Sequence, residues 1–244
     1  MATRIGILGS VGRMGRAVAT AIEAEPAVVL AGGADQGDDP AALARDCNVL
    51  VDFSAPRALE ANLEAATAAG VAIVVGTTGL DPAHQKLIEK AAARIPVLQA
   101  ANMSLGVNVL AHLVGEAAAR LGADWDIEIV EMHHRHKADA PSGTALLLGA
   151  AAAEGRGADL EAISDRGRDG ITGAREPGHI GFASLRGGSV AGDHQVIFAA
   201  EGERLELGHR AESREIFARG AVKAALWLHG RPAGRYTMAD VLGL

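Results

Sequence analysis

The chain has 244 residues, a formal net charge of −7 and a hydrophobic fraction of 49%, with only 3% aromatic residues. A nucleic-acid partner is not expected, because the chain has neither an excess of basic residues nor many aromatic side chains on which bases could stack. Cys47 is the one cysteine, which excludes an intramolecular disulfide, and neither a secretory signal pattern nor an apolar run of membrane-spanning length is visible. We therefore expect a soluble cytoplasmic protein with no membrane partner and enough apolar mass for one large or two small domains.

The first part of the chain alternates short apolar runs with helical patterns. This alternation predicts an α/β fold with a Rossmann-like, doubly wound parallel sheet, whose ligands lie beyond the carboxyl ends of the strands. The predicted strands span residues 4–8, 28–31, 49–53, 71–75 and 96–99, and helices are predicted after residue 15 and at about 57–69 and 82–93.

A glycine loop follows the first predicted strand. It reads Gly9-x-x-Gly12-x-x-Gly15 and runs into a helical pattern. A strand, a glycine loop and a helix in this order are typical of a dinucleotide site, because glycines permit a tight turn and a close approach of backbone to a pyrophosphate. The spacing differs from G-x-G-x-x-G, since Val11 stands at the middle glycine. A plain turn between strand and helix is the alternative.

Asp35 lies about 20 residues beyond the glycine loop, at the end of the second strand. An acidic residue there holds the ribose hydroxyls of a dinucleotide, although a solvated turn aspartate is the alternative. Gln36 follows, where a basic residue would favour a 2′-phosphate. The pair favours NADH over NADPH, while Arg13 in the glycine loop offers another contact to a phosphate.

The pattern changes after a predicted helix at about residues 107–121. Longer, antiparallel-looking strands are expected, Glu201-Gly202 suggests a hairpin, and residues 165–181 form a polar loop rich in glycine and arginine. We predict a second, α+β domain, followed by a helix and a short helical tail. Its strands are expected at residues 126–133, 182–186, 194–199 and 204–209, and the helix at 213–228.

Three histidines and a lysine, His133, His134, His136 and Lys137, are crowded at the end of one predicted strand. Imidazoles titrate near neutrality and suit acid–base chemistry. The turn at residues 141–144 and the helical pattern after it would supply a helix N-terminus for an anion. We predict an active site for a small acidic substrate. The alternatives are a surface basic patch and a metal site, which is disfavoured because adjacent histidines on a strand face opposite sides.

Several motifs together resemble the dihydrodipicolinate reductase family, also called 4-hydroxy-tetrahydrodipicolinate reductases. The resemblance extends over nearly the whole chain, and the block that contains the histidines is its most specific part. The motifs are Gly9-x-x-Gly12-Arg13-Met14-Gly15, Asp52-Phe53-Ser54, Gly76-Thr77-Thr78-Gly79, Ala101-Asn102-Met103-Ser104, Glu131-x-His133-His134-x-x-Lys137-x-Asp139-Ala140-Pro141-Ser142-Gly143-Thr144-Ala145, Pro177-Gly178-x-Ile180-Gly181-Phe182, Arg186-Gly187-Gly188 and Gly192-Asp193-His194.

The resemblance implies reduction of 4-hydroxy-tetrahydrodipicolinate (dihydrodipicolinate) to tetrahydrodipicolinate by NADH or NADPH, in diaminopimelate and lysine biosynthesis. It implies a dinucleotide-binding domain at residues 1–104, completed by 215–244. It also implies a domain at 105–214 that binds a small dicarboxylate substrate and builds a homotetramer through a mixed or antiparallel sheet.

The resemblance also carries site residues over by motif position. The catalytic proton donors would be His133 and Lys137. The substrate carboxylates would be held by His134, Ser142, Gly143 and Thr144. The cofactor would be bound by Gly9, Ser10, Val11, Gly12, Arg13, Met14, Asp35, Gly76, Thr77, Thr78, Ala100, Ala101, Asn102 and Met103.

Two other functions remain open from the residues alone. An amino-acid dehydrogenase of the aspartate type would share the first domain, but it would not need the histidine and lysine block with Ser-Gly-Thr. A non-catalytic protein that senses NAD(P) would keep the fold and would need an interaction module, for which the sequence shows no candidate.

Overall fold

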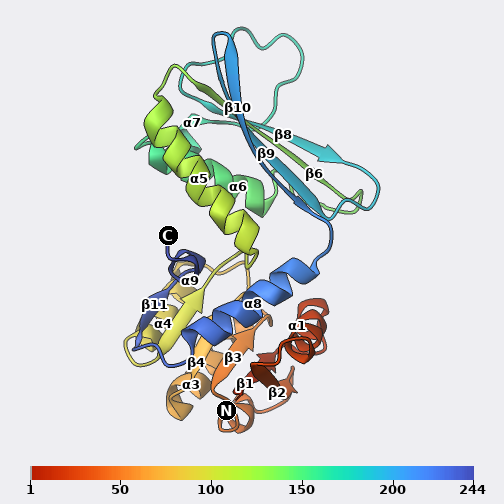
Figure 1. The fold of residues 1–244 in the computed structure, drawn as a ribbon, viewed down its shortest axis with the longest axis vertical. Helices are drawn as coiled ribbons and strands as arrows, with labels where there is room; N and C mark the ends of the chain where they lie inside the picture. The colour runs from red at the N-terminus through yellow and green to blue at the C-terminus, as the bar shows by residue number, and fades with distance from the viewer. Residues whose placement is uncertain (1) are drawn as a thin grey trace. The chain divides into compact units, whose positions relative to one another are not determined.

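The computed structural model describes residues 2–244. Contacts between Cα atoms divide the chain into two compact units (Figure 1). The first unit contains the residues up to Leu105 and the segment Glu215–Leu244, and the second contains Gly106–Arg214.

The first unit is built on a six-stranded parallel sheet with the order β11-β5-β4-β3-β1-β2. Every residue of β3 and β4 is buried, as expected for parallel strands with both faces covered. The strands are β1 (Thr3–Leu8), β2 (Val28–Ala34), β3 (Val49–Asp52), β4 (Ala72–Val75), β5 (Pro96–Gln99) and β11 (Gly234–Tyr236).

Helices cover both faces of this sheet, each over its own hydrophobic core. One core joins α1 and α8 to side chains such as Ile7 and Val51, and the other joins α3 and α4 to Leu50 and Ile73. The predicted doubly wound fold is therefore confirmed. The helices are α1 (Arg13–Glu23), α2 (Pro40–Ala44), the 3-10 turn η1 (Pro56–Ala58), α3 (Leu59–Ala69), α4 (Pro82–Ala92), α8 (Glu215–Leu228) and α9 (Met238–Leu242).

The short elements of the first unit were not all predicted. Helix α2 and strand β11 were missed, and the tail beyond α8 was expected to be helical only. Strand β11 has three residues without an apolar pattern, and it exists because it pairs with β5 at the edge of the sheet. Its register, Gly234 beside Pro96, joins segments far apart in the chain, which local sequence patterns do not encode.

The second unit contains a five-stranded mixed sheet with the order β10-β9-β6-β8-β7. The predicted hairpin is confirmed, because Ala200 pairs with Glu203 across a two-residue loop. The expectation of antiparallel strands is wrong for β8, which runs parallel to β6. Parallel neighbours need a long crossover, which α6 and α7 provide. The strands are β6 (Asp126–His133), β7 (Ser164–Asp165), β8 (Ile180–Arg186), β9 (Gly192–Ala200) and β10 (Glu203–Ala211).

Helices α5 (Leu105–Leu121), α6 (Gly143–Gly155) and α7 (Leu160–Ile163) pack against one face of this sheet (Figure 1). Residues on that face, such as Ile129 and Phe198, are fully buried. Strand β6 alternates strictly between buried and half-buried residues. Its buried face, which holds the hydrophobic core, therefore also carries Glu131 and His133 into the interior.

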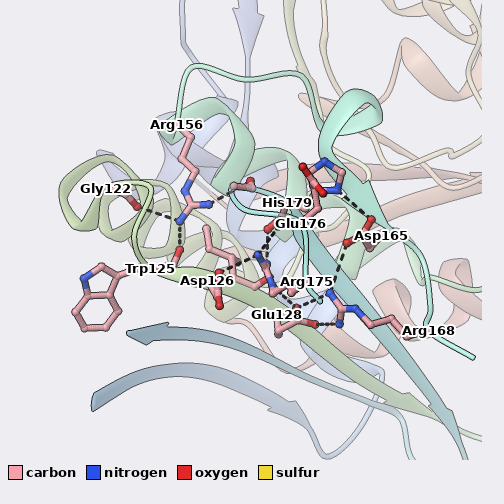
Figure 2. A network of polar contacts seen from close by, with 12 residues as sticks. Gly122, Trp125, Asp126, Glu128, Arg156, Asp165, Arg168, Arg175, Glu176 and His179 are labelled. Atoms are coloured by element: carbon pink, nitrogen blue, oxygen red, sulfur yellow. Dashed lines mark hydrogen bonds and ion pairs between the residues drawn. The ribbon is translucent and has the colours of Figure 1, made fainter. Parts of the chain in front are cut away.

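The loop between β7 and β8 is polar, as predicted, and arginines anchor it to the start of β6 (Figure 2). Arg175 pairs with Asp126 at 2.9 Å and Glu128 at 3.0 Å, and Arg168 pairs with Glu128 at 2.9 Å. Burial raises the pKa of Glu128, but the two arginines outweigh that effect and the pKa is lowered. The loop is therefore fixed to the sheet by charge rather than by an apolar core.

Candidate active site

The glycine loop of the first unit is tied to the end of β2. The Asp35 carboxylate accepts a hydrogen bond from Ser10 Oγ at 2.5 Å and one from Val11 N at 3.1 Å. Gly12 caps α1 without a side-chain hydrogen bond, so the first-turn N–H groups of this helix are not met by a cap side chain. They form the kind of donor set that binds a pyrophosphate.

A cavity of about 350 Å³ lies beside this loop. Its lining includes Gly9, Val11, Gly12 and Asp35 from the predicted cofactor set, whereas Ser10, Arg13, Met14 and the residues of the later turns do not line it. The remaining lining residues are Leu8, Ala34, Gln36, Asp38, Pro40, Phe53, Ser54, Ala55, Arg57, Ala61 and Asn62.

A buried carboxylate organises the carboxyl ends of β3 and β4. Asp52 is fully buried and accepts hydrogen bonds from Ser54 Oγ at 2.5 Å, Thr77 Oγ1 at 3.1 Å and Asn62 Nδ2 at 3.2 Å. Gly76 packs under the Phe53 ring, where a Cβ would lie 2.3 Å from a ring carbon. Thr77 is buried and is held by its hydrogen bond to Asp52, while Thr78 is exposed.

The turn after β5 is held by a side-chain hydrogen bond and by close packing on α8. Asn102 Oδ1 accepts a hydrogen bond from Ser104 N at 2.9 Å. Met103 is buried, and its carbonyl lies so close to Gly220 of α8 that a Cβ there would approach it to 1.8 Å. Earlier in the same turn, Ala100 is half-buried and Ala101 is exposed.

In the second unit, Glu131 is the centre of a buried polar cluster. It is 1% exposed and meets His133 Nδ1 at 2.6 Å, and Arg186 donates to both of its oxygens at 2.8 and 2.9 Å. The backbone N–H of Ser142 also donates to it, at 3.2 Å. Burial raises the Glu131 pKa, but hydrogen bonds from Arg186, His133 and Ser184 prevail and lower it.

Ser142 and His194 form the next layer of this cluster. Ser142 Oγ accepts from Ala145 N at 3.1 Å, which caps α6, and it lies 3.0 Å from His194 Nε2. The His194 and His133 rings pack edge to face with centroids 5.0 Å apart. Burial, and then the electrostatic effect of His133, lower the His194 pKa to about 4, so this imidazole is neutral at pH 7.

His134 and Lys137 are held by charged neighbours. Arg214 Nη2 lies 2.9 Å from His134 Nε2, and desolvation followed by the Arg214 charge lowers the His134 pKa. Lys137 Nζ donates to both Asp139 oxygens at 2.8 Å, which lowers the Asp139 pKa. The histidine and lysine cluster is thus not purely cationic, because carboxylates lie beside His133 and Lys137.

The structure brings the predicted residues of the second unit to one end of β6 and the start of α6. Glu131, Asp139, Arg186 and His194 were quoted as motif residues but were not assigned to the site, and Arg214 was missed altogether. Glu131 lies two residues before His133 on a strand, and the two therefore share a face. That spacing was the available signal. Arg214 had none, because it lies 80 residues from its partner.

The described part of the chain contains neither a metal-ligand cluster nor a membrane-spanning helix. Within residues 2–244, no group of three or more His, Cys, Asp or Glu side chains is arranged to hold a metal ion. In the same residues, no helix has the length and apolar character needed to cross a membrane.

A parallel sheet with a glycine-loop cavity, and a second unit with proton-transfer groups, define the class: an NAD(P)H-dependent oxidoreductase. Family models confirm it. The model "Dihydrodipicolinate reductase, N-terminus" matches residues 3–103, and "Dihydrodipicolinate reductase, C-terminus" matches residues 106–242. The chain belongs to the dihydrodipicolinate reductase family.

Individual relatives agree with the family models over the full length. The 4-hydroxy-tetrahydrodipicolinate reductase of Zymomonas mobilis is 62% identical over 247 residues, covering 99% of this chain and 97% of that one. The corresponding enzyme of Parvibaculum lavamentivorans is 51% identical over 265 residues, covering 99% and 98%. The activity is therefore 4-hydroxy-tetrahydrodipicolinate reduction, a step of diaminopimelate and lysine biosynthesis. This confirms the function that the resemblance implied.

A solved structure has the same fold. The dipicolinate-bound dihydrodipicolinate reductase from Paenisporosarcina sp. TG-14 aligns with a TM-score of 0.79 at 22% identity, covering 98% of this chain and 99% of that one. The predicted fold class, a Rossmann-like sheet followed by a mixed sheet, is confirmed.

Proposed function

We propose that His133 and Lys137 donate the proton that accompanies reduction of the substrate. The cofactor supplies a hydride when bound, and charge that develops on the substrate ring must be met by an acid. The observation that carries this proposal is the buried Glu131 carboxylate, 2.6 Å from His133 Nδ1. Such a carboxylate fixes the ring orientation and stabilises the protonated imidazole.

The other ring nitrogen of His133 is the one that remains for the substrate. A Cβ at Gly192 would lie 3.0 Å from His133 Nε2, so glycine at this position keeps space beside that atom. Arg186 balances the Glu131 charge through its bidentate pair, and His194 packs edge to face on the His133 ring. We propose that Glu131, Arg186 and His194 position the imidazole and do not contact the substrate themselves.

Lys137 is the second proposed donor. Its side chain is 19% exposed, whereas the Asp139 side chain that holds it is 63% exposed. An anionic substrate can displace such a solvated carboxylate partner and take its place at the ammonium group. The Lys137 ammonium would then contact both a substrate carboxylate and the reacting ring.

The substrate is proposed to be a dicarboxylate held at the start of α6. Gly143 is the first residue of this helix, is exposed, and has open space where a Cβ would be. Helix N-termini favour anions, and His134, Ser142 and Thr144 complete the proposed set. The Ser142 hydroxyl is already engaged by Ala145 N and His194, so Ser142 contributes by shaping the helix start. The dipicolinate bound to the Paenisporosarcina enzyme is a ligand of this chemical type.

The nicotinamide cofactor is proposed to bind the first unit. The glycine loop and the cavity beside it fit a dinucleotide, because a Cβ at Gly9 or Gly15 would clash with backbone at 2.6 or 2.2 Å and the loop keeps its tight form only with glycine. The proposed contacts are residues 9–14, Asp35, residues 76–78 and residues 100–103. NADH is proposed as the preferred cofactor, because Asp35 and the neutral Gln36 directly follow β2.

The domain roles and the assembly follow from the same proposal. Residues 1–104 with 215–244 would bind the dinucleotide, and residues 105–214 would bind substrate and form a homotetramer through the mixed sheet. The face of that sheet opposite α5 and α6 supports this assembly, because it carries half-buried Val130 and Met132 and the half-exposed Leu185. The tetramer is proposed to act in the cytoplasm.

The test is oxidation of the reduced cofactor, with the substrate generated in place from aspartate semialdehyde and pyruvate by dihydrodipicolinate synthase. Lys137→Ala is expected to lower turnover by roughly 10²- to 10⁴-fold, the usual contribution of a general acid, while cofactor affinity is unchanged. Lys86→Ala, an exposed position of α4, is the matched control and should retain full turnover. Equal loss of turnover and cofactor affinity in Lys137→Ala would contradict the assigned role.

A further inference from the structure

A groove with a volume of about 260 Å³ lies between α3 and α4 of the first unit. It shares no lining residue with the cavity beside the glycine loop. Its floor is apolar, because Leu63, Leu87 and Ala91 line it, and these residues belong to the core that the two helices form with β3 and β4. None of its lining residues belongs to the proposed cofactor or substrate contacts.

The two sides of the groove carry opposite charges. Glu60 and Glu64 lie one helical turn apart on α3 and form its acidic side. Lys90 in the last turn of α4 and Arg94 just beyond that helix form its basic side. All four residues are exposed. The charges cancel in sum, so the groove as a whole attracts neither anions nor cations.

The acidic side and the basic side do not neutralise each other directly. Across the residues that the structure describes, none of these four charged groups takes part in an ion pair or a side-chain hydrogen bond. Glu89, which does not line the groove, is by contrast paired with Arg235 at 3.5 Å. Both the carboxylates and the cations of the groove are therefore available to a ligand that enters between them.

This arrangement specifies the charge pattern of the ligand. A singly charged ligand is attracted by one side of the groove and repelled by the other. A zwitterion gains from both sides when its ammonium group faces the acidic side and its carboxylate faces the basic side. The guanidinium of Arg94 suits a carboxylate, which it binds through two parallel N–H···O bonds. Methylene groups between the two charges would lie on the apolar floor and lose contact with water.

We infer that the groove between α3 and α4 binds a small zwitterion, namely an amino acid whose ammonium and carboxylate groups are separated by several methylene groups. Glycine is too short for this site, because the axes of packed helices are roughly 8–10 Å apart and its two charges cannot reach both sides. The inference does not depend on the roles proposed for His133 and Lys137.

Titrations of the full chain at low ionic strength test this inference, with saturation-transfer NMR as the readout for weak ligands. The probes 6-aminohexanoate, hexanoate and hexylamine share a six-carbon chain and differ in their charged ends. An ion pair at an exposed site is worth a factor of up to about 5 in affinity. We therefore expect 6-aminohexanoate to bind roughly 5-fold more tightly than either singly charged probe, and glycine not to bind.

Two double variants separate the sides of the groove. Glu60→Gln with Glu64→Gln should weaken 6-aminohexanoate by roughly 5- to 10-fold and strengthen hexanoate, because only the basic side remains. Lys90→Gln with Arg94→Gln should weaken 6-aminohexanoate to a similar extent and strengthen hexylamine instead. Both double variants should keep wild-type turnover, which shows that they are folded. Lys223→Gln, an exposed position of α8 that does not line the groove, is the control and should bind every probe as the wild type does.

The active site is a second place where a carboxylate could bind, and Lys137→Ala excludes it. This variant should bind 6-aminohexanoate as tightly as the wild type. Loss of binding in Lys137→Ala, with no loss in the two double variants, would place the probe in the active site and overturn the inference. Absence of binding to the wild type, or equal affinity for 6-aminohexanoate, hexanoate and hexylamine, would overturn it as well.

Discussion

His194 makes the stability of the second unit depend on pH in the mildly acidic range. The residue is 5% exposed, and burial followed by the electrostatic effect of nearby His133 lowers its pKa from 6.5 to about 4, although Glu131 acts in the opposite direction. The unfolded chain therefore binds a proton at a pH where the folded chain does not. This contribution to stability is fully present above about pH 6.5 and is lost as the pH falls toward 4.

Linkage sets the size of this effect. For one group with an unfolded pKa of 6.5 and a folded pKa of about 4, stability falls by roughly 2 kcal/mol between pH 8 and pH 5. A loss of that size is a substantial part of the total stability of an ordinary domain. Other titrating groups add their own slopes, so a comparison between variants isolates the His194 contribution.

Urea unfolding of wild type and His194→Gln at pH 8, 7, 6 and 5 measures it, at one fixed protein concentration because assembly also shifts stability. The glutamine can still bond Ser142 but does not titrate in this range. The wild-type free energy of unfolding should fall by roughly 2 kcal/mol more than that of His194→Gln. His112→Gln, at an exposed position of α5, is the control and should follow the wild type. Parallel curves for wild type and His194→Gln would refute the reasoning.

Three other predictions concern single side chains. Glu131→Gln should lower turnover without changing cofactor affinity, because His133 loses the carboxylate 2.6 Å from Nδ1 that orients its ring; unchanged turnover would contradict this. Gly220→Ala should destabilise the chain by about 3 kcal/mol in thermal unfolding, since its Cβ would lie 1.8 Å from the Met103 carbonyl, and a change below about 0.5 kcal/mol would count against the packing. Cys47 should react with a colorimetric thiol reagent at pH 8 only after urea unfolding, because burial raises its pKa to about 11; rapid reaction of the native chain would show the thiol to be accessible.

Much of the architecture could be predicted from the sequence alone. Continuous apolar strands alternating with helical patterns determine a parallel sheet, because each strand must bury both faces and each crossover needs a helix. The glycine loop and the block from Glu131 to Ala145 likewise mark their own sites, since residues close in sequence are held close in space. The strand β6 was predicted with its observed ends, Asp126–His133.

Tertiary structure decided the features that depend on contacts between distant segments. Strand β8 runs parallel to β6 because of the crossover between them, and β11 exists only by pairing with β5. Arg186 lies 55 residues from Glu131, and Ser142 lies 52 from His194. Arg57 meets Gln36 across 21 residues. The sequence by itself determined the fold class and the reactive groups, because both are local patterns. Which charges surround those groups was decided only when packing brought separate elements together.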